Sequence, residues 1–596
     1  MAAGTERGGA VPTEAPRPKG RSLGVNSSVV FSISIVIQLV GYIPTFFLAR
    51  GLGLSVAGQT LFGTIQTFLL LATSVTNLAD VRIGAAYTFF VSRGEPARDA
   101  TSTYFTIRIL MVAGAGLALW LLAPSFGVAA SSAWPIFAVW MVLPILWSTS
   151  TVYQNLWVSL GDSARGQYPQ LVESLVRAAL LSYFALGFLH ATGHGTATPT
   201  ATLWAMTYAY VAGAVASGLF SLPSILAQRG RIRRATAARF FRWSWPLMGS
   251  LVLLYLSGNL ISFVVIALLS KAAFNIFNAA NAFRVLALAL PAAIAVPLFP
   301  HISSLHKEEA FQMIRSRTWQ TLRFTAILVV PGVLALAVYR VNILNILYSA
   351  SYLGGSTALA ILAVSAIPAA LSQIIGTTMT SIGRTRLELY ITSLQVACLA
   401  AVSALLVRPP SGLPGFPGGT GLASLLPAGL LPATAATFTG LNGAAVAVLV
   451  SSLAALALNA YFLYTLLGVR IQLTPIATIV LSSLASFLAI SQLNDLLPIN
   501  RYYQLAAGVV LGFAVYLVVL AAVGELTKED VATVGRSLGL PEGFARYFGR
   551  LCWRAESRPV NPIPPRGAAG LVPLEAEWAG AGIGPEDPSP PPPPAP

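Results

Sequence analysis

The sequence carries very little charge. Charged side chains make up 9% of the 596 residues, whereas 56% are hydrophobic. A soluble domain has roughly 25% charged residues, so this chain has too few to solvate a globular surface of its size. The shortage excludes an aqueous enzyme and predicts an integral membrane protein.

Cysteine and nucleotide-binding motifs are also scarce or missing. The two cysteines are Cys398, in an apolar run, and Cys552, in a polar tail, which excludes a disulfide framework and a cysteine-based metal site. There is no Walker motif, and no paired-carboxylate loop suggests a membrane glycosyltransferase. We therefore expect no cofactor, no metal and no enzymatic activity.

Apolar runs of 18 or more residues recur along the chain. Each is long enough to cross a hydrocarbon core of about 30 Å as a helix. The predicted fold class is all-α and integral to the membrane, with about fourteen transmembrane helices, or thirteen because charges follow the second run. The expected spans are 27–49, 57–77, 104–123, 134–154, 171–189, 204–224, 245–268, 277–300, 321–339, 358–382, 387–407, 441–467, 474–493 and 503–523.

The net charge of +16 has a topological pattern. With the N-terminus inside, most of the 36 Lys and Arg residues fall in every second connection between spans, as the positive-inside rule requires. This spacing predicts a plasma-membrane protein with cytoplasmic N- and C-termini. It argues against nucleic-acid binding, which needs one basic patch with interleaved aromatics.

Polar and Pro-rich stretches divide the chain. We predict two six-helix bundles, 26–227 and 245–467, followed by two additional helices in 468–524. The basic linker 228–244 contains GRIRRATAARFFRW, which can form a short amphipathic helix on the inner leaflet. The polar N-terminus 1–25, the Pro/Gly-rich outer loop 408–440 and the Pro-rich tail 525–596 complete the chain, and the N-terminus and the end of the tail are expected to be disordered.

Two segments resemble each other and indicate an internal repeat. The first, GYIPTFFLARGLGLSVAGQTLFGTIQTF, begins at Gly41, and the second, GNLISFVVIALLSKAAFNIFNAANAF, begins at Gly258. Each has an apolar helix end, a short turn, and small and aromatic residues that open another helix. Their offset equals six spans, an even number, so the bundles are predicted to be pseudo-symmetric parallel repeats that rock about a shared cavity.

These junctions also carry a family resemblance, together with PAAIAVPLFPHISSL after Arg284, NILNILYSASYLGGS and GELTKEDV after the last span. Over roughly residues 25–535 the chain resembles polysaccharide and lipid-linked oligosaccharide flippases, which share the fold of multidrug and toxic-compound extrusion transporters. The resemblance implies a cationic cavity for the phosphate or pyrophosphate of a lipid carrier.

Arg284 is the most informative ionisable residue within the expected spans. Intramembrane charges are costly and usually face the bundle interior or a wet cavity. Asn278 and Asn281 lie six and three residues before it, on the same helical face. A guanidinium can bind two phosphate oxygens and the amides can bind sugar hydroxyls. The alternative is an arginine bonded to carbonyl groups across the bundle.

The remaining candidates divide by position. Arg177 has Glu173 four residues before it, which favours an internal ion pair; Arg177 is also a cavity candidate and Glu173 a coupling candidate. Arg108 and Arg323 lie near span ends and are expected to reach the interface, although Arg108 can also face the cavity. Asp80 and Arg82 are close enough to balance each other. Arg50, Arg82 and Asn259 complete the set, and Asn259 is neutral where the resemblance implies an acid.

The sequence thus predicts a flippase that moves polyprenyl-phosphate- or pyrophosphate-linked oligosaccharide from the inner to the outer leaflet for cell-surface polysaccharide or glycoprotein assembly. An arginine-bearing cavity favours an anionic lipid over a cationic drug. The expected partners are the bilayer, the lipid-linked glycan and proteins of glycan assembly, and the chain is expected to be a monomer. The alternatives are an ion-coupled drug or metabolite antiporter of the same fold, and a membrane scaffold or an enzyme of envelope glycan assembly.

Overall fold

The structure is a computed structural model. It describes residues 32–33, 36–38, 40–42, 44, 46–48, 56–80, 83–92, 95–121, 134–192, 199–245, 248–307, 309–407, 440–496 and 501–526. Across these residues the regular elements are helices, with no strand among them, which confirms the all-α prediction. The N-terminus 1–25 and nearly all of the loop 408–440 and the tail 525–596 lie outside the described residues.

Eleven helices in the described part of the chain are long and apolar enough to cross a membrane. In a bilayer the helix is the form in which a single segment satisfies its own backbone hydrogen bonds. The helices are α2 (Val56–Leu78), α4 (Ala97–Leu121), α5 (Trp134–Ser159), α8 (Pro199–Ala227), α11 (Lys271–Lys307), α12 (Phe311–Val338), α14 (Ser356–Ser381), α15 (Thr385–Leu406), α16 (Leu441–Leu467), α17 (Leu473–Leu496) and α18 (Arg501–Val523).

Three further expected spans are helical where they are described. Span 171–189 forms α7 (Tyr168–Thr192) and span 245–268 forms α10 (Met248–Leu268). Within span 27–49, the described residues are helical, and those from residue 36 on belong to a shorter apolar helix, Val36–Leu48. A multi-pass membrane protein is therefore established, while the total of fourteen spans stays a prediction.

Short helices interrupt this series. They are α3 (Ile83–Ser92), α6 (Ser163–Gly166), α9 (Arg234–Ser244), α13 (Arg340–Leu347) and a 3₁₀ turn, η3 (Ala350–Gly355). The helix α9 confirms the amphipathic helix predicted in the basic linker. Helix α3 is buried: Tyr87 is 0% exposed and packs in one apolar cluster with Tyr104 of α4 and Phe240 of α9.

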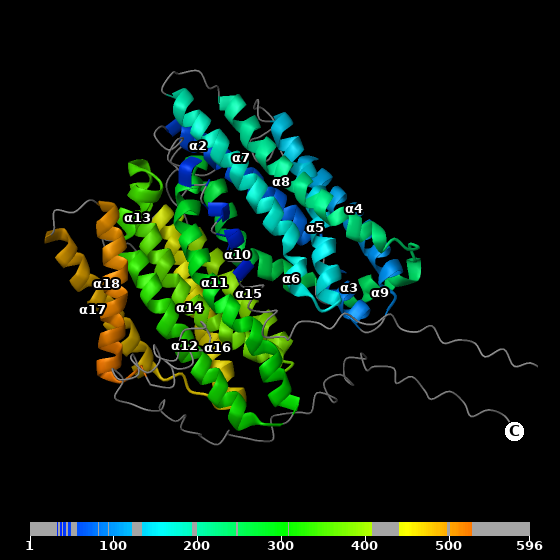
Figure 1. Cartoon of the computed structure of the whole chain (residues 1–596). Coiled ribbons are helices and arrows are strands. Elements are labelled where there is room, and N and C mark those ends of the chain that lie inside the picture. Colours follow the sequence, from blue (N-terminus) through cyan, green and yellow to red (C-terminus); the bar gives the residue numbers. More distant parts are fainter. Residues whose placement is uncertain are drawn as a thin grey trace, which may run out of the picture. The chain divides into compact units, whose positions relative to one another are not determined.

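The chain forms two compact units. Unit 1 comprises Met1–Ile276 with Leu347–Gly354, and unit 2 comprises Phe277–Ile346 with Gly355–Pro596. In unit 1, α5 packs against α2, α4 and α8, and α7 runs along α8 (Figure 1). The division into bundles at 228–244 and their pseudo-symmetry stay predictions.

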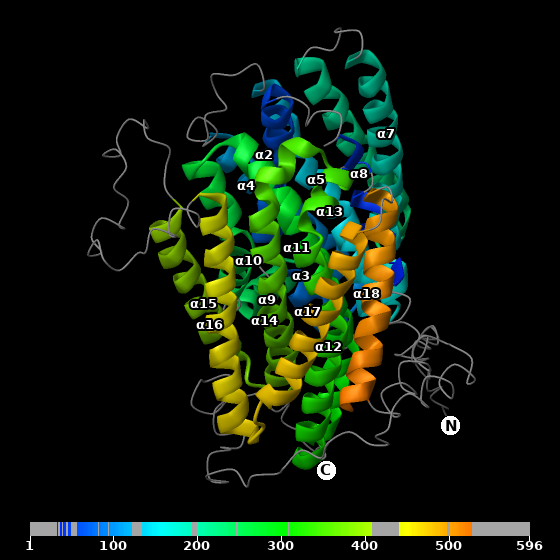
Figure 2. The same cartoon turned by 90° about the vertical axis from the view of Figure 1, so that its left-hand side faces the viewer.

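Unit 2 is built around α14. This helix packs against α12, α15 and α16, and α17 and α18 lie side by side, with α17 against α12 (Figure 2). Small residues such as Ala363, Ala366 and Ala370 on α14 let the helices approach closely. The Arg323 side chain is buried and donates to the backbone carbonyl of Glu525 beyond the end of α18, and the expectation that it reaches the membrane interface stays a prediction.

Candidate functional site

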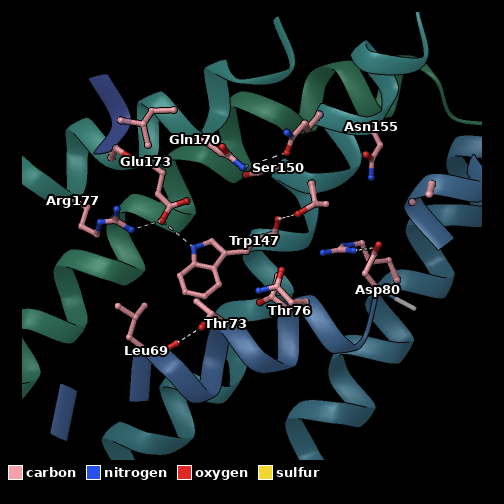
Figure 3. A pocket seen from close by; sticks show the side chains of 18 residues that line it. Leu69, Thr73, Thr76, Asp80, Trp147, Ser150, Asn155, Gln170, Glu173 and Arg177 are labelled. Atoms are coloured by element: carbon pink, nitrogen blue, oxygen red, sulfur yellow. Dashed lines mark hydrogen bonds and ion pairs between the residues drawn. The ribbon is translucent and has the colours of Figure 1, made fainter. Parts of the chain in front are cut away.

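Unit 1 contains a partly open cavity of about 610 Å³. Its walls come from the helix Val36–Leu48 and from α2, α3, α4, α5 and α7, and Figure 3 shows Trp147 of α5 at its centre, between Arg177 and Asp80. The polar lining consists of two arginines, two carboxylates, four amides and five hydroxyls: Arg108, Arg177, Asp80, Glu173, Asn77, Gln154, Asn155, Gln170, Thr73, Thr76, Ser150, Thr151 and Ser174.

The polar lining follows helical periodicity. On α5 the residues at 147, 150, 151 and 154 line the cavity, and on α7 the residues at 170, 173, 174 and 177 do the same. Both sets have the spacing i, i+3, i+4, i+7, which places four side chains on one face of a helix. Two polar helix faces inside an otherwise apolar bundle therefore form most of the site.

Glu173 is the centre of the polar contacts on one side of the cavity. Its Oε1 accepts from Arg177 Nη1 at 2.9 Å and from Trp147 Nε1 at 3.2 Å. The Arg177 guanidinium also lies over the ring of Tyr210, 5.1 Å from its centroid. The ion pair predicted between Glu173 and Arg177 is therefore present. The Glu173 carboxylate, by accepting from Nε1, holds the Trp147 indole in one orientation. The Arg177 side chain remains 21% exposed.

Asp80 organises the opposite side. Its carboxylate forms an ion pair with Arg108 and accepts from the Tyr104 hydroxyl at 3.2 Å. Asn155 of α5 in turn donates to that hydroxyl at 2.8 Å. This chain of contacts joins α4 and α5 to the turn between α2 and α3. The Arg108 side chain is only 2% exposed, is paired with Asp80 and lines the cavity, which is the position predicted from the sequence as the alternative to the interface.

Gly84 is required where α3 passes this network. A Cβ at this position would lie 2.6 Å from Asn155 Nδ2 and 2.8 Å from the Tyr104 hydroxyl. Both groups are hydrogen-bonded and Tyr104 is fully buried, so neither can move without cost. We expect Gly84→Ala to lower the free energy of unfolding by about 1–3 kcal/mol, which thermal unfolding in detergent measures.

Gly114 of α4 provides the matched control, because a Cβ there meets no atom within 4 Å. Gly114→Ala should raise stability by about 0.5–1 kcal/mol, since alanine favours the helix. Equal changes in stability from the two substitutions would show that the network around Gly84 can accommodate a Cβ atom.

The charges of the cavity balance in the described lining. Arg108 and Arg177 face Asp80 and Glu173, so the two formal positive charges are matched by two negative ones. An anionic ligand must compete with these carboxylates for the arginines. The amides and hydroxyls can donate to and accept from a polyhydroxylated group.

The other predicted site residues lie elsewhere. In unit 2, Arg284 Nε donates to Ser365 Oγ of α14 at 3.0 Å, and Asn278 and Asn281 are half-buried on the same helix. In unit 1, Asn259 donates to the carbonyl of Tyr255, one turn earlier, at 3.1 Å. Arg50 and Arg82 lie outside the described residues.

Sequence reasoning missed several residues of the site. It placed Asp80 beside Arg82, which lies outside the described residues, and it did not foresee the ion pair of Asp80 with Arg108, 28 positions later. It also overlooked Trp147, Asn155 and Gln170. The signal available was the i, i+3, i+4, i+7 repeat of polar residues on two apolar spans, which marks a helix face turned away from lipid.

Comparisons with known proteins agree with this architecture. A family model described as "Polysaccharide biosynthesis protein" matches residues 59–357. The chain is similar to a solved structure of the lipid II flippase MurJ in an inward closed conformation, with 14% identity, a TM-score of 0.61, and coverage of 83% of this chain and 98% of that chain.

The chain is also similar to an inward-facing multidrug resistance MATE family transporter of the MOP superfamily, with 14% identity and a TM-score of 0.51. That match covers 76% of this chain and 96% of the other. No curated protein matches the sequence significantly. The structural likenesses confirm the all-helical fold shared with these transporters, and the family match confirms the predicted resemblance.

Proposed function

The chain belongs to the polysaccharide biosynthesis protein family, and from this we propose that it is a flippase for polyprenyl-phosphate- or pyrophosphate-linked oligosaccharide. It moves the glycan head group from the inner to the outer leaflet by alternating access. The observation that carries the proposal is the cavity in unit 1, where two arginines, each paired with a carboxylate, lie among amides and hydroxyls inside a flippase-like fold.

The chemistry of the lining matches the two parts of such a head group. Phosphate oxygens are bound by guanidinium groups, and sugar hydroxyls are bound by amides such as Asn155 and Gln170. Arg177 is the more accessible of the two cavity arginines, with 21% of its side chain exposed against 2% for Arg108. We therefore assign the phosphate contact in unit 1 to Arg177 and a positioning role to Arg108.

Arg284 is the candidate contact in unit 2. Among the described contacts, its Nε donates to Ser365, and the terminal nitrogens of the guanidinium would bind a phosphate. Asn278 and Asn281 lie on the same helix and suit the sugar. Alternating access requires two halves, and the predicted bundles 26–227 and 245–467 would be these halves. In this proposal the protein lies in the plasma membrane and both termini are cytoplasmic. We also retain the monomer and the partners of glycan assembly as proposals.

The test is leaflet exchange in proteoliposomes containing the purified full-length chain. A fluorescent lipid-linked oligosaccharide should exchange between leaflets and an ordinary labelled phospholipid should not. Arg284→Ala should reduce exchange about tenfold or more, because hydrogen bonds to a charged group contribute about 1.5–3 kcal/mol.

Ser365→Ala is the matched control for Arg284. It removes the partner of Arg284 Nε but keeps the guanidinium, so exchange should persist. If both substitutions reduce thermal stability equally and neither reduces exchange selectively, Arg284 has a structural role. Absence of glycan-lipid exchange together with proton-dependent efflux of cationic dyes would favour the antiporter, for which Asp80 and Glu173 would be the cavity acids.

A further inference from the structure

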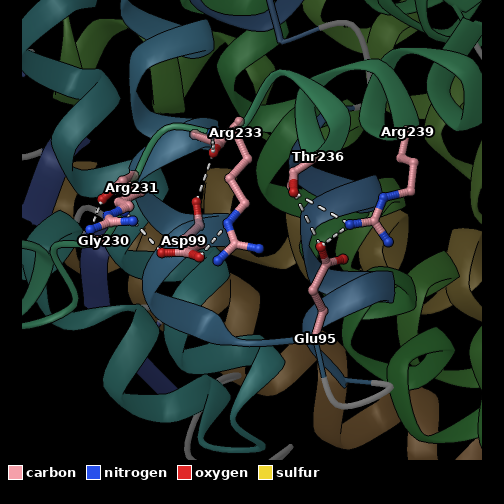
Figure 4. Close-up of polar contacts among 9 residues, drawn as sticks. Glu95, Asp99, Gly230, Arg231, Arg233, Thr236 and Arg239 are labelled. Atoms are coloured by element: carbon pink, nitrogen blue, oxygen red, sulfur yellow. Dashed lines mark hydrogen bonds and ion pairs between the residues drawn. The ribbon is translucent and has the colours of Figure 1, made fainter.

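The linker helix α9 packs against the rest of unit 1 through one of its faces. Arg233 forms an ion pair with Asp99 at 2.7 Å, and Arg239 forms one with Glu95 at 2.5 Å (Figure 4). Phe240, next to Arg239 in the chain, is fully buried against Phe90 of α3. These contacts hold α9 against the segment that joins α3 to α4.

The chain entering α9 is attached just as closely. The backbone N–H of Gly230 donates to Ser102 Oγ at 2.8 Å, and that of Arg231 donates to Asp99 Oδ1 at 2.9 Å. A Cβ at Gly230 would lie 2.5 Å from Asp99 Oδ1 and 2.6 Å from the backbone of Arg98, so the two segments touch. The orientation of α9 about its own axis is therefore determined by unit 1.

The opposite face of α9 is exposed and has a distinct composition. Positions 234, 238, 241, 242 and 245 share one side of the helix and its C-cap, and all five are exposed. Two of them are large aromatics, Phe241 at 40% exposure and Trp245 at 72%. Two others are arginines, Arg234 and Arg242.

The arginines of this region fall into two groups. Arg233 and Arg239 are neutralised by Asp99 and Glu95. Four others, all exposed, form no ion pair with a described acidic residue: Arg229, Arg231, Arg234 and Arg242. The two ion pairs thus neutralise Arg233 and Arg239, although their side chains are themselves exposed, and leave the outward face that carries Arg234 and Arg242 positive.

We infer that the outward face of α9 binds the surface of an anionic leaflet. The position in the chain supports this partner: α8 ends at Ala227 and α10 begins at Met248, so α9 is connected at both ends to helices of the bundle. Arginines attract anionic head groups, and Phe and Trp side chains insert at the boundary between head groups and acyl chains. A soluble acidic protein would match the charge but not the two aromatics.

This contact connects lipid charge to the cavity. The helices that α9 packs against are α3 and α4, and these carry Gly84 and Arg108 of the cavity lining. An anionic leaflet that holds α9 in place also holds the ends of these helices next to Glu95 and Asp99. The inference does not depend on the identity of the transported lipid.

Site-directed fluorescence quenching of the full-length chain in lipid nanodiscs tests the inference. Cys398 and Cys552 are replaced by serine, Ala238→Cys on the outward face carries an environment-sensitive fluorophore, and nitroxide-labelled lipids act as quenchers. We expect quenching to be about twofold or more stronger with roughly 30% anionic lipid than with zwitterionic lipid alone, and to weaken at high salt.

Two variants separate charge from folding. Arg234→Gln with Arg242→Gln should remove the difference between the two lipid compositions, whereas Arg234→Lys with Arg242→Lys should keep it. Both pairs are exposed, so size-exclusion profiles should match that of the parent. Quenching that is equal in both lipids, or a difference that survives the glutamine pair, would overturn the inference.

Discussion

Asp80→Asn is expected to lower the free energy of unfolding by about 3 kcal/mol, because it leaves the Arg108 guanidinium buried without a carboxylate. The Arg108 side chain is 2% exposed, and Asp80 is the one described acid in contact with it. The substitution also weakens the acceptor of the Tyr104 hydroxyl. Thermal and denaturant unfolding of the purified chain in detergent measure the change.

An exposed pair in the same unit provides the control. Asp162 pairs with Arg165, whose side chain is 55% exposed, and caps α6 by accepting from its backbone N–H. Asn caps helices as well as Asp does, and surface pairs contribute little, so Asp162→Asn should change stability by less than about 1 kcal/mol. Adding Arg108→Gln to Asp80→Asn should restore part of the loss. Similar losses of stability from Asp80→Asn and Asp162→Asn would contradict the conclusion that the pair of Asp80 with Arg108 is buried and stabilising.

The second large effect is expected at Arg177 in the leaflet-exchange assay. Arg177→Gln combined with Glu173→Gln should reduce exchange of lipid-linked oligosaccharide about 100-fold, because a charged hydrogen-bond donor to phosphate is lost. The double substitution avoids leaving Glu173 as a buried unpaired acid, and both new amides can still hydrogen-bond. Thermal stability should therefore stay close to that of the wild type.

Two comparisons make this result specific. Arg165→Gln with Asp162→Asn removes an exposed pair of the same type and should leave exchange unchanged.

Glu173→Gln alone tests coupling: a proton on Glu173 releases Arg177 Nη1, so wild-type exchange should depend on pH and the variant should not. The charged groups facing Glu173 are limited to Arg177 in the described contacts, with Trp147 and Tyr210 as neutral neighbours. Full exchange by the variant Arg177→Gln with Glu173→Gln would show that Arg177 does not bind the phosphate.

The positions of the helices could be predicted because the bilayer imposes a length on each apolar run. The expected spans 134–154 and 441–467 correspond to α5 (Trp134–Ser159) and α16 (Leu441–Leu467). The ion pair between Glu173 and Arg177 could also be predicted from the sequence, because residues four apart on a helix lie on the same face. Local periodicity determines both results.

Partners distant in the chain could not be predicted in this way. Asp80 and Arg108 lie on different elements, and their pairing depends on how the α2–α3 turn packs against α4. The same holds for Arg284, whose partner Ser365 belongs to α14, and for Arg323, which bonds to the chain beyond α18. A sequence shows that such groups need partners but not which helix supplies them.

By itself the sequence determined the all-helical membrane class, the approximate spans, the alternation of positive charge and the amphipathic linker, since each follows from hydrophobic length or from spacing along one helix. Tertiary structure alone decided that the polar faces of α5 and α7 meet Asp80 and Arg108 in one cavity, and that two of the linker arginines form ion pairs with Asp99 and Glu95. The physical reason is that helix packing, which depends on side-chain shape across several segments, selects which polar groups come within hydrogen-bonding distance.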